Sequence, residues 1–222
     1  NKMNFKNKAK IIMLSLGIIV ALNSCLAVAA VGAVGAGISA AVSIIELPIK
    51  IISGVVNIVS GSSREKEVKK VGETKYMKAI NKVLASNRKE IKIGNFNVYI
   101  FETLEFAKQD KLFQLTDTKN KIQFPFTANV ETYNSKEELE NKLDEFAKSE
   151  GVSKGTTVEN QSIKTHSYEV RINNKKEKTI EKYKVVLIEK GNELLTYQYL
   201  ISTDASYELE KQLFENIINN TF

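Results

Sequence analysis

Hydrophobic and charged residues divide the chain into two parts. No charged residue occurs between Lys10 and Glu46, so residues 11–45 form an uncharged stretch of 35 residues. A helix needs roughly 20 apolar residues to cross a bilayer, and this stretch is longer. From Arg64 onward, apolar and charged positions alternate at helical or strand spacing. The pattern predicts a membrane-associated N-terminal part followed by one folded domain over residues 64–222.

Period-two alternation predicts strands through much of the second part. Six segments carry the pattern, and the first is long enough for a strand pair: residues 91–101, 112–115, 122–130, 162–173, 182–189 and 194–201. Residues 117–120 and the pair Gly191-Asn192 are expected to form turns. Pro125 interrupts the third segment and cannot donate a backbone hydrogen bond, so we expect it at an edge or a bulge.

Three helices are expected in the same part, the first over residues 64–87. The second begins at the capping box Ser135-Lys136-Glu137-Glu138 and ends before Gly151. Its apolar face contains Leu139, Leu143, Phe146 and Ala147. The closing helix, capped by Asp204, has an apolar face made of Leu213, Phe214, Ile217, Ile218 and Phe222. The order of elements predicts an α+β fold, an antiparallel sheet with helices packed on one face.

The charge of the chain does not favour a nucleic-acid partner. The formal net charge is +6, but four lysines of the first ten residues account for most of the excess, and the rest of the chain carries only +2. Three of the 32 basic residues are arginine, the residue suited to bidentate contacts with bases and phosphates. The lysines alternate with glutamates, as on a solvated surface, so we expect no nucleic-acid binding.

The N-terminal residues have the pattern of a secretory signal. A lysine-rich lead precedes the aliphatic run from Ile11 to Leu22, and Leu22-Asn23-Ser24-Cys25 follows at once. Leu22, Ser24 and Cys25 resemble the lipobox of bacterial lipoprotein precursors, from which Asn23 departs. The resemblance implies that residues 1–24 are a lipoprotein signal peptide, cut before Cys25, which then carries diacylglycerol and an amide-linked acyl chain such as palmitate. The alternative is an ordinary signal peptide cut near residues 27–30.

Residues 25–63 form a Gly/Ala-rich, membrane-proximal segment for which helices are expected. Small residues recur every four positions at Ala29, Ala33, Gly37 and Ala41. On a helix they make a ridge that allows close packing of another backbone. Self-association through this ridge and a simple tether are equally compatible with the pattern. Just beyond the segment, a basic cluster of Lys66, Lys69 and Lys70 could contact anionic headgroups.

The chain from about residue 91 resembles the PsbP/Mog1/DcrB-like fold family. The similarity rests on a strand pair running into Phe113-Gln114-Leu115, a mid-domain helix, and a hairpin rich in Tyr and Val. It also rests on the closing helix, with the pattern Tyr207, Phe214, Ile217, Ile218 and Phe222. The family's frequent first-loop tryptophan is absent, because this chain has none. The resemblance implies a secreted or lipid-anchored accessory or assembly protein without catalytic residues.

Few residues suggest catalysis or metal binding. The chain has one histidine, His166, and one cysteine, the Cys25 expected to carry the lipid. These two residues cannot provide the ligand set of a zinc site. With Cys25 used for the anchor, no cysteine remains to form a nucleophile pair with His166. We expect His166 to be half-buried on a strand and bonded to a hydroxyl group. No cofactor and no metal site are predicted, and an envelope hydrolase using His166 or a carboxylate pair is a less favoured hypothesis.

The sequence therefore predicts a lipid-anchored protein of the cell envelope, in the outer membrane if the host has two membranes. Its domain is expected to be a non-catalytic binding or assembly module. Possible partners are another protein or a second copy, met by the sheet face or by a surface of Tyr183, Tyr197 and Tyr199. The alternative is an integral helical-hairpin protein that oligomerises through the small-residue ridge.

Overall fold

The structure, a computed structural model, describes residues 61–222 except 110–111, 161–162 and 175–177. The expected signal peptide, the lipobox with Cys25, and the small-residue ridge from Ala29 to Ala41 lie outside the described residues, as does the proposed helical hairpin. Among the described helices, none is both long and apolar enough to cross a membrane.

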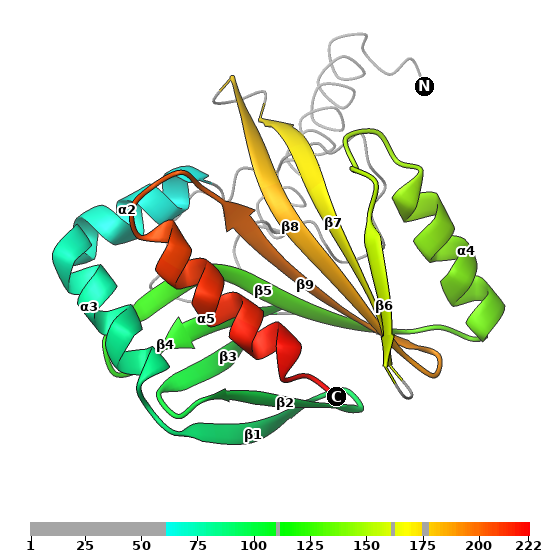
Figure 1. Cartoon of the computed structure of the whole chain (residues 1–222), viewed down its shortest axis with the longest axis horizontal. Helices are drawn as coiled ribbons and strands as arrows, with labels where there is room; N and C mark the ends of the chain where they lie inside the picture. The colour runs from blue at the N-terminus through cyan, green and yellow to red at the C-terminus, as the bar shows by residue number, and fades with distance from the viewer. Residues whose placement is uncertain (1–60, 110–111, 161–162, 175–177) are drawn as a thin grey trace, which may run out of the picture. The chain divides into compact units, whose positions relative to one another are not determined.

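Antiparallel strands form the centre of the domain (Figure 1). A seven-stranded sheet has the order β3-β4-β5-β9-β8-β7-β6, and β1 pairs with β2 in a separate two-stranded sheet. The strands are β1 (Arg88–Ile93), β2 (Phe96–Phe101), β3 (Leu104–Gln109), β4 (Leu112–Asp117), β5 (Ile122–Thr132), β6 (Thr156–Asn160), β7 (Ile163–Asn174), β8 (Thr179–Lys190) and β9 (Glu193–Ile201). The helices are α2 (Gly61–Val71), α3 (Glu73–Leu84), α4 (Lys136–Ala147) and α5 (Tyr207–Asn219). The predicted α+β class with an antiparallel sheet is confirmed.

Helices cover both faces of the large sheet. On β8, Val186 and Ile188 pack in a core with α3 and α5, whereas Val185 and Leu187 pack in a second core with α4. We expected the helices to pack on one face of the sheet. Helices α3 and α5 do share one face, whereas α4 covers the opposite face. The second half of β8 reads Val185-Val186-Leu187-Ile188 without polar alternation because both of its faces are buried, as in sheets covered on two sides.

The predicted N-cap of α4 at Ser135 is confirmed, but the second hydrogen bond of the capping box differs, because the Glu138 carboxylate binds the N–H of Asn134 and not that of Ser135. The Glu138 backbone N–H donates to Ser135 Oγ at 3.1 Å, while the Glu138 carboxylate accepts from the backbone N–H of Asn134 at 3.0 Å. This satisfies two backbone donors at the start of the helix. Ala147, which was expected on the buried face, is exposed, because α4 ends at that residue.

Several boundaries differ from the expected ones. Residues 64–87 form two helices, because Gly72 takes a φ of 85° and turns the chain between them. The edge strands β3 and β6 were not foreseen. Pro125 lies on the interior strand β5, at a register shift against β4 between Gln114 and Thr116, so its placement at a bulge is confirmed.

The closing helix α5 fills the core beneath the sheet. Leu213, Phe214 and Ile217 are fully buried, and the Phe214 ring stacks on Phe126 with a centroid separation of 4.9 Å. The expectation for Phe222 is wrong: its side chain is 51% exposed. The helix has ended by then, and the Phe222 backbone instead exchanges two hydrogen bonds of 2.9 Å with Asn97.

Replacing Phe214 by alanine should destabilise the domain by about 3–5 kcal/mol, because a buried ring is lost and a cavity is left. Thermal and urea unfolding measure the change. Phe222→Ala is the matched control, since it removes the same ring from an exposed site, and it should lower stability by about 1 kcal/mol or less. Equal stability of Phe214→Ala and wild type would contradict the assigned core.

Candidate functional site

A buried charged cluster lies where the chain enters the domain. Arg64 on α2 donates from Nε to Glu210 Oε2 at 2.9 Å and from Nη2 to Ser206 Oγ at 2.8 Å, and it also pairs with Asp204. Tyr76 on α3 donates its hydroxyl to the same Glu210. Arg64 is 3% exposed and Glu210 is fully buried. The cluster joins α2, α3, the loop before α5 and α5 itself.

The electrostatics of this cluster favour a persistent ion pair. Burial raises the pKa of Glu210 above its usual value, and the charge of Arg64 opposes that rise. Burial lowers the pKa of Arg64, but the charge of Glu210 together with the hydrogen bonds to Glu210 and Asp204 raises it, and the net shift is upward. The Arg64 hydrogen bond holds the pKa of Asp204 below its usual value. The guanidinium is thus committed to its partners within the fold, and the role of the cluster is to fix α2.

A second contact fixes the first described residue. The Gly61 backbone N–H donates to Glu181 Oε1 on β8 at 2.8 Å, and the other oxygen of Glu181 accepts from Tyr183 Oη at 2.6 Å. Glu181 is 8% exposed. Together with Arg64, this contact holds the first turn of α2 against the rest of the domain.

The basic cluster expected after the membrane segment lies on α2. Lys66, Lys69 and Lys70 are exposed, and the structure adds exposed lysines from α3, which the sequence reading did not connect with them. The signal was present in the sequence as lysines at i, i+3 and i+7 over residues 75–82, but the Gly72 turn is needed to bring the two helices together.

His166 has the hydroxyl partner that was expected. On β7, its Nδ1 lies 2.9 Å from Thr157 Oγ1 of β6, and its Nε2 bonds to Glu189 of β8. His166 and Glu189 are 8% and 6% exposed. A hydroxyl, an imidazole and a carboxylate in a row are the residue types of a nucleophile with its base. However, Thr157 lies on an edge strand whose five residues are all exposed, so no surrounding walls would exclude water from a reaction there.

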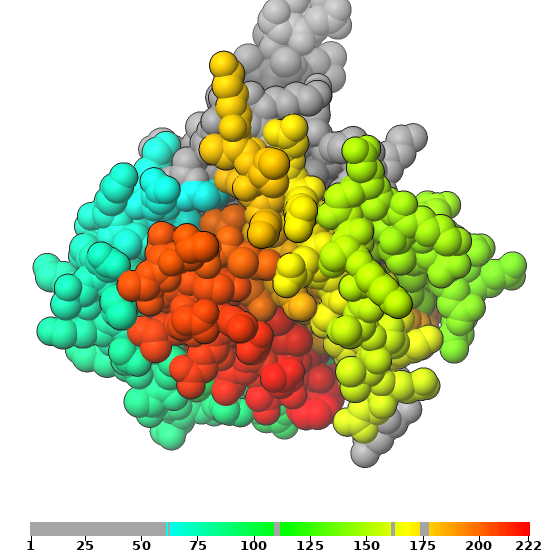
Figure 2. Space-filling view, turned by 45° about the horizontal axis from the view of Figure 1, so that its top comes forward, coloured from blue at the N-terminus to red at the C-terminus, as the bar shows by residue number. Residues whose placement is uncertain are grey.

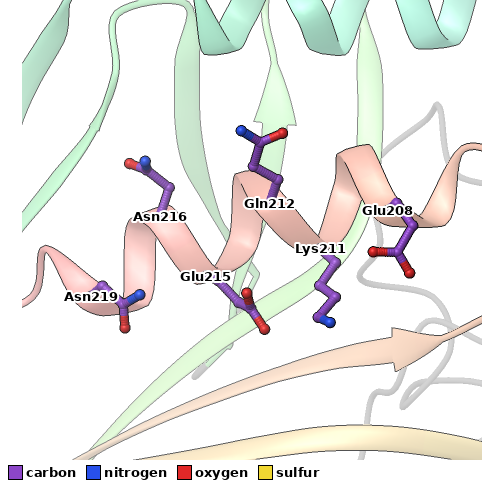
Figure 3. A pocket seen from close by; sticks show the side chains of 6 residues that line it. All are labelled: Glu208, Lys211, Gln212, Glu215, Asn216 and Asn219. Atoms are coloured by element: carbon purple, nitrogen blue, oxygen red, sulfur yellow. The ribbon is translucent and has the colours of Figure 1, made fainter.

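A shallow hollow of about 300 Å³ lies on the outer side of α5 (Figure 3). Gln212 and Asn216 point toward α3, whereas Lys211 and Glu215 point the other way. Glu208 and Asn219 complete the lining, and all six lining residues are polar or charged. Ligand pockets are usually lined mainly by hydrophobic and aromatic side chains with a few polar groups, and no such side chain lines this hollow.

The expected tyrosine surface is wrong. Tyr183, Tyr197 and Tyr199 are 1%, 0% and 2% exposed. Tyr197 and Tyr199 pack in the core that contains α5, and Tyr183 lies in the core of α4. Strand β9 and the second half of β8, from Val185 to Glu189, are buried on both faces, so neither set of their alternating side chains remains at the surface.

A layer of uncharged polar side chains was missed by the sequence reading. The strand register places Gln114 opposite Thr127, Thr127 opposite Gln198, and Asn129 opposite Thr196. These five residues are between 2% and 7% exposed. Asn129 Oδ1 has no hydrogen-bond partner in the described part of the chain. Threonine and amide residues at alternate positions were the available signal, and the result is a buried polar layer of the sheet.

Comparison with known proteins assigns no family. No family model matches the chain, and no curated protein matches it. A crystal structure from Bacteroides thetaiotaomicron VPI-5482 is similar over 57% of this chain and 44% of that chain, with 12% sequence identity and a TM-score of 0.37. The alignment spans less than half of that protein, and a likeness of this size carries no conclusion about function.

Within residues 61–222, as far as they are described, no three His, Cys, Asp or Glu residues are grouped to hold a metal.

Arg64→Ala should destabilise the domain by about 3–5 kcal/mol, because Glu210 then stays buried without its charged partner. The free energy of unfolding in urea measures the effect. Lys69→Ala, on the same helix but with a side chain that is 80% exposed, is the control and should change stability by about 0.5 kcal/mol or less. The double variant Arg64→Met with Glu210→Gln removes both charges and should be more stable than Arg64→Ala. A double variant no more stable than Arg64→Ala would contradict the buried-charge explanation.

The contribution of Asp204 should depend on pH. Its pKa is lower in the folded state than the ordinary value of 3.8, so its stabilising effect is present above the unfolded pKa and is lost as the pH falls through the folded value. The stability difference between wild type and Asp204→Asn should therefore be largest near neutral pH and shrink below about pH 4. Urea unfolding at a series of pH values tests this, with the exposed Glu208→Gln as the control. A difference that stays constant down to the lowest pH would argue against the Arg64–Asp204 pair.

Proposed function

We propose that this protein is a lipid-anchored component of the bacterial cell envelope whose α+β domain is a non-catalytic binding or assembly module. Acyl chains on Cys25 hold it at the membrane, and residues 26–60 connect the anchor to the domain. Two buried acyl chains suffice for stable anchoring, whereas one is marginal. The proposal thus needs no membrane-spanning helix.

The observation that carries the proposal is the double attachment of α2. Gly61 bonds to Glu181, and Arg64 is buried against Glu210. The chain that leads back toward Cys25 therefore joins the domain at one fixed place. A module that acts by being placed at a membrane requires such a defined junction, since a loose first helix would leave its orientation undetermined.

The arrangement of polar groups also favours binding over catalysis. Glu210 is paired with Arg64, and His166 lies between Thr157 and Glu189. Each of these buried groups is committed to a contact between elements of the fold. The sequence resemblance to the PsbP/Mog1/DcrB-like family, whose members often serve as accessory or assembly proteins, points to the same class of function.

Acylation of Cys25 can be tested by growing expressing cells with labelled palmitate. Wild type should incorporate the label, and Cys25→Ser should lose it, because the thiol is the acceptor of the diacylglycerol. Ser24→Ala is the matched control: it keeps a small residue before the cysteine and should be labelled like wild type. The intact mass of the mature protein should correspond to a chain that starts at Cys25.

Equal labelling of wild type and Cys25→Ser would refute the anchor, as would a mature chain that retains residues 11–45. In a host with two membranes, fractionation should place the acylated protein with the outer membrane. Leu26 and Ala27 follow the cysteine, without the aspartate that acts as an inner-membrane retention signal in many enteric bacteria. Recovery with the inner membrane alone would contradict that location.

A further inference from the structure

The helices α2 and α3 present two rows of exposed lysines. On α2, Lys66, Lys69 and Lys70 follow an i, i+3, i+4 spacing, and on α3 the spacing is i, i+3, i+7, so each set shares one helix face. The six residues are Lys66, Lys69, Lys70, Lys75, Lys78 and Lys82, and all are exposed. In Figure 2 the two helices lie side by side on the left of the view, and α4 lies on the right.

Charge is unevenly distributed between these helices and the rest of the domain. Residues 61–84 contain seven basic and three acidic residues, a net charge of +4, whereas residues 85–222 contain 20 basic and 22 acidic residues, a net charge of −2. Of these six lysines, only Lys69 and Lys70 have ion-pair partners among the described residues, at 3.7 and 3.6 Å on their own helix. The positive charge of the domain is thus concentrated on α2 and α3.

We propose that the exposed lysine surface of α2 and α3 binds anionic phospholipid headgroups of the membrane to which Cys25 is anchored, and so orients the domain. This inference rests on the proposed lipid anchor. Clusters of basic residues next to a membrane anchor are attracted to anionic lipid surfaces over about one Debye length. The net negative charge of the remaining domain disfavours the other orientations.

Three features favour a lipid surface over other acidic partners. The exposed cations of the two helices are all lysines, which act as mobile point charges and lack the planar fork of arginine for bidentate recognition of one phosphate group. The lysine surface begins at Lys66, three residues beyond the end of the membrane-proximal segment, so the anchor raises the local concentration of headgroups around it. Binding of this surface to the membrane would orient the whole domain, because Arg64 fixes α2 to α5.

The acylated full-length protein, reconstituted into vesicles, tests this orientation. One set of vesicles contains phosphatidylcholine alone, and the other contains equal parts of phosphatidylcholine and phosphatidylglycerol. Lysines are labelled with an amine-reactive acetylating reagent and quantified by mass spectrometry. The exposed Lys136 and Lys148 of α4, with side chains 71% and 79% exposed, provide the internal reference. Labelling of the six lysines relative to α4 should fall several-fold in the anionic vesicles and recover in about 1 M salt, where the Debye length is about 3 Å.

Charge reversal provides a second arm. Lys66→Glu with Lys78→Glu should abolish the protection of the four remaining lysines, whereas Lys136→Glu with Lys148→Glu should preserve it. Equal relative labelling in the two kinds of vesicle would overturn the proposal. Protection in native envelopes but not in anionic vesicles would also overturn it, in favour of an acidic protein partner. The mass of the same preparation shows whether Cys25 is acylated, which separates failure of the orientation from failure of the anchor.

Discussion

The buried pair of Arg64 and Glu210 is the interaction on which the arrangement of this domain depends. A carboxylate with no exposed surface is tolerated only with a charged partner and hydrogen bonds, and Arg64 and Tyr76 supply both. These contacts hold α2 and α3 against α5. Without them, the first two helices would be held by the partly buried side chains of α2 and the apolar face of α3 alone.

Burial of the central strands on both faces explains most of the remaining structure. Strands β8 and β9 carry side chains into two cores, so α4 can cover one face while α3 and α5 cover the other. The same property removes the three central tyrosines from the surface. Among the described residues, exposed side chains are instead concentrated on helix faces and on edge strands such as β6.

Local signals in the sequence were sufficient for several elements, but not for the start of α5, whose N-cap is Ser206 and not the expected Asp204. The Ser135 cap, the bulge at Pro125 and the apolar face of α5 each depend on residues close in the chain. The edge strand β6 was missed because its sequence, Thr-Thr-Val-Glu-Asn, is short and wholly exposed. Phe222 was misplaced because helical spacing alone does not show where a helix stops.

The charged cluster at the start of the domain could not be found in this way. Arg64 reads as one more basic residue in a lysine-rich helix, and its partner Glu210 is 146 positions away. Similarly, continuous apolar runs in β8 and β9 indicate two-sided burial only when a second covering helix is known. Tertiary packing decides which residues of a strand remain exposed. The periodicity of the sequence alone does not give this information.

The separation between Arg64 and Glu210 has a consequence for the order of events during synthesis. During synthesis, α2 leaves the ribosome before α5. The core that contains α3 and α5 therefore cannot close until nearly the whole chain is available. Contacts between residues so far apart in the sequence also form slowly. If the chain is exported as a lipoprotein precursor, as we propose, this order helps to keep it unfolded during export. Closure of the principal core then waits until α5 is available to pack against α2 and α3.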